Sequence, residues 1–173
     1  MTICALVLAA VSLLSASDAA QSTAPTTVVI VRHAEAVPDA GRDPALADGG
    51  RARAAALAEA LRDAGVAAVY TTQFQRTRLT GTDVAAAANV QVTVRPIEGS
   101  ATDYAAALAA HVLSTHAGHT VVIVGHSNTV PALVKAFSGV AMPDLAHDSY
   151  DTMFVISARG PGKAAVVRAR YGR

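Results

Sequence analysis

The segment that most strongly indicates the architecture of this chain is Val28-Val29-Ile30-Val31-Arg32-His33-Ala34-Glu35. Its four consecutive β-branched apolar residues are typical of a strand that is covered on both faces of a sheet. The run ends abruptly in Arg32 and His33, so a cation and an imidazole stand where the strand leaves the sheet. The segment therefore predicts a buried strand with a reactive tip.

Strand-like and helix-like segments alternate along the rest of the chain. Strands are expected over residues 66–72, 90–95 and 120–124, and a terminal hairpin over 153–157 and 164–170, turning at Gly160-Pro161-Gly162. Helices are expected over residues 48–63, 75–88, 102–116 and 130–137. We expect Asp48 to cap the first helix and Gly65 to follow its end.

This alternation predicts an α/β fold, a three-layer α/β/α sandwich with a mostly parallel central sheet. We expect one catalytic domain over residues 27–173, with no second domain and no internal repeat. In open parallel sheets the ligand lies beyond the carboxyl ends of the strands. His33, Arg76 and His126 all follow such ends, so they are the candidates for a shared site.

The first 20 residues have the composition of a secretory signal peptide. Residues 3–14 are almost wholly apolar, and the small residues of 15–20 suit cleavage after Ala19 or Ala20. An apolar run of this length is shorter than the roughly 20 residues that span a bilayer, so no stable membrane anchor is expected. The prediction is a periplasmic or secreted protein that loses Cys4, its one cysteine, on cleavage.

Charge and histidine spacing exclude two further classes of partner. The chain has 14 Lys and Arg against 13 Asp and Glu and contains no basic tract, which argues against nucleic acid as the main partner. His111, His116 and His119 straddle an expected helix end, where histidine complements the helix dipole more often than it binds a metal. No metal site is therefore predicted.

Two arginines and two histidines at one end of a sheet suit a tetrahedral dianion. Guanidinium groups match phosphate oxygens bidentately and stay charged at any working pH. A neutral imidazole can accept a phosphoryl group while the surrounding cations stabilise the charge on its oxygens. The pattern of Arg32, His33, Arg76 and His126 therefore points to phosphoryl chemistry.

The same residues carry a resemblance to a known family. Val31-Arg32-His33-Ala34-Glu35 resembles the Arg-His-Gly motif region of the histidine phosphatase superfamily, the phosphoglycerate-mutase-like enzymes, with Ala34 in place of the glycine. Three more segments are similar to family motifs and follow in the family's order. They are residues 46–54 (LADGGRARA), 71–77 (TTQFQRT) and 124–127 (VGHS).

The resemblance implies a phosphatase that hydrolyses phosphomonoesters through a phosphohistidine on His33, without a metal or an organic cofactor. It implies that Arg32 and Arg76 bind the phosphoryl group together with His126. The family commonly places an acidic proton donor between the second arginine and the second histidine, and Glu98 is the candidate there. Asp103 and Glu35 are the alternatives.

Other functions stay open from the sequence. Residues 125–129 (GHSNT) are similar to the Gly-x-Ser-x-Gly elbow of α/β-hydrolases, which would make Ser127 the nucleophile of an esterase, although the last glycine is missing. A non-catalytic member that binds phosphorylated ligands is a second alternative. A mutase is disfavoured because the compact chain has no evident inserts. The expected partner is a small phosphorylated substrate, and the sequence leaves its identity and the oligomeric state open.

Overall fold

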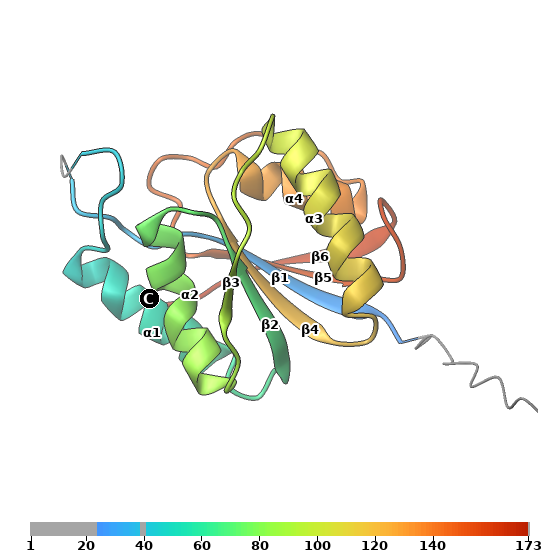
Figure 1. Cartoon of the computed structure of the whole chain (residues 1–173), viewed down its shortest axis with the longest axis horizontal. Coiled ribbons are helices and arrows are strands. Elements are labelled where there is room, and N and C mark those ends of the chain that lie inside the picture. Colours follow the sequence, from blue (N-terminus) through green and yellow to red (C-terminus); the bar gives the residue numbers. More distant parts are fainter. Residues whose placement is uncertain (1–23, 39–40, 173) are drawn as a thin grey trace, which may run out of the picture.

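The computed structural model describes residues 24–38 and 41–172 (Figure 1). The expected signal peptide, residues 1–20, lies outside this part of the chain. Within it, none of the helices combines the length and the apolar character needed to cross a membrane.

The described residues form a six-stranded sheet with the order β3-β2-β4-β1-β5-β6. Its strands are β1 (Thr26–Arg32), β2 (Val66–Thr71), β3 (Val92–Val94), β4 (Thr120–Gly125), β5 (Thr152–Ala158) and β6 (Ala164–Arg170). The first four are parallel, whereas β5 pairs antiparallel with both β1 and β6. The mostly parallel sheet and the terminal hairpin at its edge are therefore confirmed.

Four helices cover the two faces of this sheet, which completes the predicted three layers (Figure 1). They are α1 (Asp48–Ala60), α2 (Gln75–Ala87), α3 (Ala101–Thr115) and α4 (Thr129–Ser138). The first two pack against each other on one face, and the last two do so on the other.

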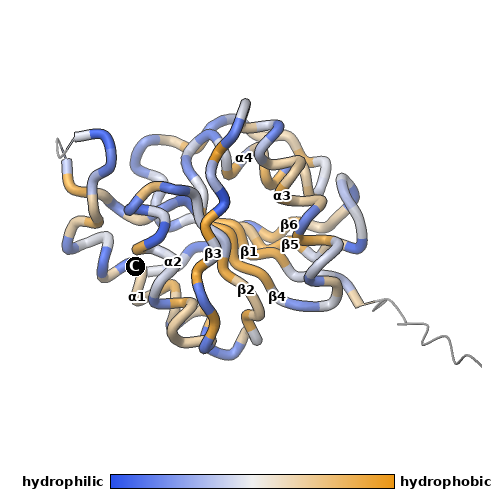
Figure 2. The backbone as a smooth tube through the Cα atoms, viewed as in Figure 1, coloured by the Kyte–Doolittle hydropathy of each residue, from blue (hydrophilic) through white to orange (hydrophobic). Residues whose placement is uncertain are grey.

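Alternate residues of β1 face the two cores of the domain, which explains its uninterrupted apolar run. Val28 and Ile30 pack with residues of α3 and α4, whereas Val29 and Val31 pack with residues of α1 and α2. All four are at most 2% exposed. The central strands accordingly form the continuous hydrophobic band of Figure 2.

The strand register brings the reactive tips together. Arg32 lies opposite Gly125 in the parallel β1–β4 pair, and the His33 N–H donates to the Gly125 carbonyl at 2.9 Å. A Cβ atom at Gly125 would lie 2.7 Å from Oγ1 of Thr129, a hydroxyl that accepts a 2.8 Å hydrogen bond from the His126 N–H. Glycine at this position therefore permits the tight turn that presents His126 beside His33.

Element ends account for the differences from the predicted boundaries. Ala47 is the cap of α1, and Asp48 is its first residue. The helix starts one residue earlier than predicted because the Ala47 N–H donates to the Glu35 carbonyl and fixes the chain there. The helix ends at Ala60, before a turn that leads to Gly65 at a φ of +60°. β3 has only three residues, because the Val90 N–H is used to extend the end of α2 by bonding the Ala85 carbonyl.

Candidate active site

A cavity of about 530 Å³ opens at the carboxyl ends of β1, β2 and β4. Three of the residues predicted from the sequence line it, namely His33, Arg76 and His126. The other residues of its wall are Phe74, Ile97, Ser127 and Asn128. The two imidazole rings face each other edge to face, with their centroids 5.3 Å apart. The structure therefore unites both histidines and one arginine in a single pocket.

The imidazole of His33 is held in one orientation and one tautomer. Its Nδ1 lies 2.8 Å from the Ala34 carbonyl, which can only accept, so Nδ1 carries the proton and Nε2 keeps a free electron pair. The Ala34 N–H in turn donates to Oγ1 of Thr80 in α2 at 2.9 Å, which fixes this peptide. Burial lowers the pKa of His33 to about 4, and the charges of Arg32 and Arg76 act in the same direction. The ring is therefore neutral at physiological pH, with an electron pair on Nε2 that could attack an electrophile.

A chain of hydroxyl groups holds the second histidine. Nε2 of His126 lies 2.9 Å from Oγ1 of Thr72, which lies 2.9 Å from Oγ1 of Thr77. Thr77 donates to the Phe74 carbonyl at 2.8 Å, which ends the chain at a group that can only accept. Burial lowers the pKa of His126 to about 3, with further contributions from His33, Arg76 and Arg32. In the empty pocket both imidazoles are therefore neutral.

Arg76 supplies the positive charge of the pocket wall. It lies in the first turn of α2, and its guanidinium carbon stacks 4.5 Å from the centre of the Phe74 ring. The same ring meets His126 edge to face at 5.3 Å, so Phe74 spaces the cation from the imidazole. One carboxylate oxygen of Asp43 is 3.9 Å from Arg76, at the limit of an ion pair. Asp43 is therefore too far away for a strong ion pair with Arg76.

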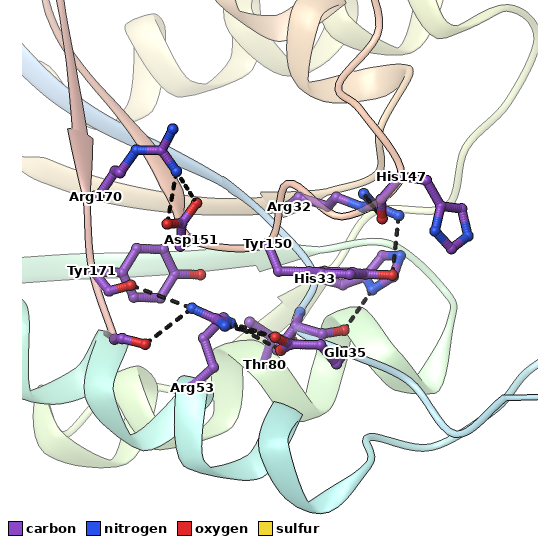
Figure 3. A network of polar contacts seen from close by, with 12 residues as sticks. Arg32, His33, Glu35, Arg53, Thr80, His147, Tyr150, Asp151, Arg170 and Tyr171 are labelled. Atoms are coloured by element: carbon purple, nitrogen blue, oxygen red, sulfur yellow. Dashed lines mark hydrogen bonds and ion pairs between the residues drawn. The ribbon is translucent and has the colours of Figure 1, made fainter.

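Arg32 is held by the segment before β5 (Figure 3). Its Nη1 donates to the carbonyl oxygens of Ala146 at 2.9 Å and His147 at 3.0 Å, and its guanidinium lies 4.2 Å from the centre of the Tyr150 ring. The buried Nε has no hydrogen-bond partner among the described residues. The Tyr150 ring is also 6.0 Å from that of His33. Tyr150 thus connects Arg32 to His33, a contact that no local motif in the sequence indicated.

The three candidate proton donors occupy other surroundings. Glu35 forms a bidentate ion pair with Arg53, whose hydrogen bonds lower the pKa of that carboxyl (Figure 3). Glu98 and Asp103 both line a separate cavity, and Asp103 accepts a hydrogen bond from Ser100 at the start of α3. Among the described residues, the wall of the His33 pocket includes no carboxylate.

The alternative chemistries fit these surroundings less well. Ser127 lines the pocket, but an esterase would need His147 with Asp144 or Asp148 beside it, and none of these three residues is part of the described wall. Nowhere in residues 24–38 and 41–172 do three His, Cys, Asp or Glu side chains gather in a way that could hold a metal ion. His111 and His116 instead both meet the hydroxyl of Tyr70, at 3.0 and 2.8 Å.

Comparisons with known proteins find one family match and solved structures of similar fold. Residues 28–97 match the family model of the histidine phosphatase superfamily, branch 1. The putative phosphohistidine phosphatase SixA from Nakamurella multipartitia is 27% identical, with a TM-score of 0.63 over 84% of this chain and 96% of that chain.

Two ligand-bound structures have a similar fold. The protein histidine phosphatase SixA complexed with tungstate is 20% identical, with a TM-score of 0.66 over 83% of this chain and 96% of that chain. A mycobacterial glucosyl-3-phosphoglycerate phosphatase with inorganic phosphate is 18% identical, with a TM-score of 0.65 over 85% and 97%. No curated protein sequence matches the chain.

Proposed function

Because the chain belongs to the histidine phosphatase superfamily, we propose that it is a phosphatase that hydrolyses phosphomonoesters through a phosphohistidine on His33. The observation that carries this proposal is the bond from Nδ1 of His33 to the Ala34 carbonyl, which leaves Nε2 unprotonated. That nitrogen belongs to a pocket that also presents Arg76 and His126. A nucleophile, a cation and a second hydrogen-bonding ring are the groups that phosphoryl transfer needs.

The reaction has two displacements. In the first, the electron pair on Nε2 of His33 attacks phosphorus, the phosphorus–oxygen ester bond breaks, and the leaving oxygen takes a proton from a water molecule. In the second, water attacks the phosphohistidine, the nitrogen–phosphorus bond breaks, and inorganic phosphate leaves with His33 regenerated. Arg76, with Arg32 and His126, stabilises the charge on the phosphoryl oxygens in both steps. These residues supply the positive charge that magnesium supplies in many phosphoryl transferases, so we propose a metal-independent reaction.

Protonation of the leaving group is the least assisted step, because the described wall of the pocket lacks a carboxylate. We propose that esters of acidic alcohols and phenols are therefore cleaved faster than alkyl esters, since their leaving groups need less protonation. The substrate panel should also contain a phosphohistidine peptide and a phosphorylated sugar acid, because similar solved structures are named as phosphatases of such compounds.

Trapping of the intermediate tests the proposal. After brief mixing with a labelled phosphomonoester, wild-type protein should carry acid-labile phosphate on His33, and His33→Ala should carry none and lose turnover. Ser127→Ala should keep most of the turnover. Loss of activity in Ser127→Ala with retention in His33→Ala would instead support the esterase, and phosphate binding without turnover would support the non-catalytic alternative.

We also propose that the protein is exported, on the strength of the signal-peptide composition of residues 1–20. Expression of the full chain in a Gram-negative host should give a periplasmic protein that begins near Gln21, as shown by mass spectrometry of the intact chain. Uncleaved protein in the cytoplasmic fraction contradicts this proposal.

A further inference from the structure

Two buried threonines behind the pocket form a hydroxyl chain that starts at His126. Nε2 of His126 lies 2.9 Å from Oγ1 of Thr72, and that oxygen lies 2.9 Å from Oγ1 of Thr77. Both threonines have 0% of their surface exposed, so neither hydroxyl reaches the solvent or a ligand. The hydroxyl chain can therefore act on the reaction only through the histidine.

The donors of the hydroxyl chain can be ordered from its far end. Oγ1 of Thr77 donates to the Phe74 carbonyl at 2.8 Å, and the Thr72 carbonyl lies 3.2 Å from the same oxygen. A carbonyl can only accept, and a hydroxyl has one proton to donate. Thr77 therefore accepts from the Thr72 hydroxyl. That hydroxyl has no second proton, so it accepts an N–H from Nε2 of His126.

This order of donors fixes the tautomer of His126. A neutral imidazole carries one N–H, so protonation at Nε2 leaves a free electron pair on Nδ1. Among the described residues Nε2 has a hydrogen-bond partner and Nδ1 has none. Nδ1 is also not one of their fully shielded unpaired atoms, so it keeps access to the cavity that the ring lines. Both histidines thus offer an electron pair to the pocket, through Nε2 at His33 and Nδ1 at His126.

A pocket with these two electron pairs suits a phosphate group that brings its own proton. The oxygens of a phosphate dianion can only accept, so they form no hydrogen bond with Nδ1, whereas the O–H of a monoanion can donate to it. Burial lowers the pKa of this ring, and His33, Arg76 and Arg32 lower it further, so the ring is neutral before binding. The opposite charge of a bound phosphoryl group favours the imidazolium form, which lets the proton pass to Nδ1.

We propose that Thr72 and Thr77 are positioning residues that hold His126 with its proton on Nε2, so that the pocket takes a phosphate ester as its monoanion and Nδ1 receives the proton. In this transfer the O–H bond of the ester breaks, an N–H bond forms at Nδ1, and the ester remains as a dianion beside the imidazolium. The new N–H donates to the phosphoryl oxygen that released it. The proposal rests on the phosphatase function proposed above and explains how the pocket obtains this donor.

The tautomer of His126 in the free protein tests the hydroxyl chain. In proton–nitrogen correlation spectra at neutral pH, the imidazole signals that disappear in His126→Gln should show protonation at Nε2. Thr77→Val removes the acceptor of the Thr72 hydroxyl, which should then donate to Nε2 and shift the tautomer toward protonation at Nδ1. Thr71→Val is the matched control, because Thr71 is equally buried and its hydroxyl donates outside the chain, to the Thr72 carbonyl at 3.3 Å. Protonation at Nδ1 in wild type, or an unchanged tautomer in Thr77→Val, would overturn the proposal.

Proton uptake on binding of inorganic phosphate tests the transfer to Nδ1. Calorimetry well above the second pKa of phosphate, in buffers of different ionisation enthalpy, measures this uptake in a His33→Ala background, in which His33 cannot contribute. About one proton should be taken up for each phosphate bound, with clearly less uptake after Thr77→Val and no change after Thr71→Val. Phosphate binding without proton uptake would overturn the proposal. The measurement does not depend on turnover, so this failure is distinguished from failure of the phosphatase function.

Discussion

The neutral state of His33 gives a measurable dependence of stability on pH. The pKa of His33 is about 4 in the folded protein, against 6.5 for a histidine exposed to water, because burial disfavours the imidazolium form. Between these values the unfolded chain binds a proton that the folded chain does not, so the free energy of unfolding falls as the pH falls from about 7 to 4. At 1.36 kcal/mol for each pKa unit, His33 alone accounts for a loss of about 3 kcal/mol by pH 4.

Urea denaturation of wild type and His33→Gln at several pH values measures this contribution. Protonation of carboxylates also destabilises the protein in acid, but it affects both proteins alike and cancels in the difference between their curves. What remains is the contribution of His33 together with its smaller effect on the pKa of His126. The loss of unfolding free energy between pH 7 and 4 should be smaller in His33→Gln by about 2 to 3 kcal/mol. His119→Gln, which removes an exposed histidine outside the pocket, is the matched control. Parallel curves for wild type and His33→Gln would refute the assignment of a buried, neutral nucleophile.

Three further substitutions test the pocket. Arg76→Ala removes charge-assisted hydrogen bonds to the transition state, so kcat/KM for phenyl phosphate should fall about 10- to 100-fold, while Arg78→Ala on the exposed side of α2 should leave it unchanged. Glu98→Gln should change kcat for phenyl phosphate less than about 3-fold, because a general acid would contribute at least 100-fold; a larger loss in steady-state kinetics would make Glu98 the proton donor. Tyr150→Leu removes the ring on which Arg32 stacks, so kcat/KM for phenyl phosphate should fall about 5-fold. Tyr150→Phe keeps the ring and should lower kcat/KM less. Equal losses in the two variants would contradict a role for stacking.

The predicted elements were reliable where the sequence determines them locally. The run from Val28 to Val31 predicted a strand buried on both faces, and both cores confirm it. His33 and His126 were brought together because each directly follows a strand, and parallel neighbouring strands end at the same edge of a sheet. Arg76 joins them from the first turn of α2, close behind the end of β2.

Tertiary contacts of distant segments could not be predicted in the same way. Arg32 meets Tyr150 and the carbonyls of Ala146 and His147, more than 110 residues along the chain, in a segment without regular structure.

Glu98 illustrates a second limit of prediction from the sequence. Its place in the sequence made it the candidate acid, but β3 ends at Val94, so no strand register fixed the direction of the next side chains. In the structure Ile97 lines the His33 pocket, whereas Glu98 lines a separate cavity.

The surroundings of His33 and His126 explain why both imidazoles are neutral in the empty pocket, and why a bound phosphoryl group would change their protonation. Burial lowers the pKa values of His33 and His126, Arg32 and Arg76 lower them further, and Glu35, outside the described wall, offsets this only in part at His33. A bound phosphoryl dianion reverses this field, because an opposite charge a few ångströms away favours the protonated form of an imidazole. In the proposed reaction, His33 shares its electron pair with phosphorus, so the gain in proton affinity falls on His126, which would then donate to a phosphoryl oxygen. Burial and the two arginines therefore keep His33 unprotonated in the empty pocket, and in the proposed reaction the charge of the substrate completes the charge balance.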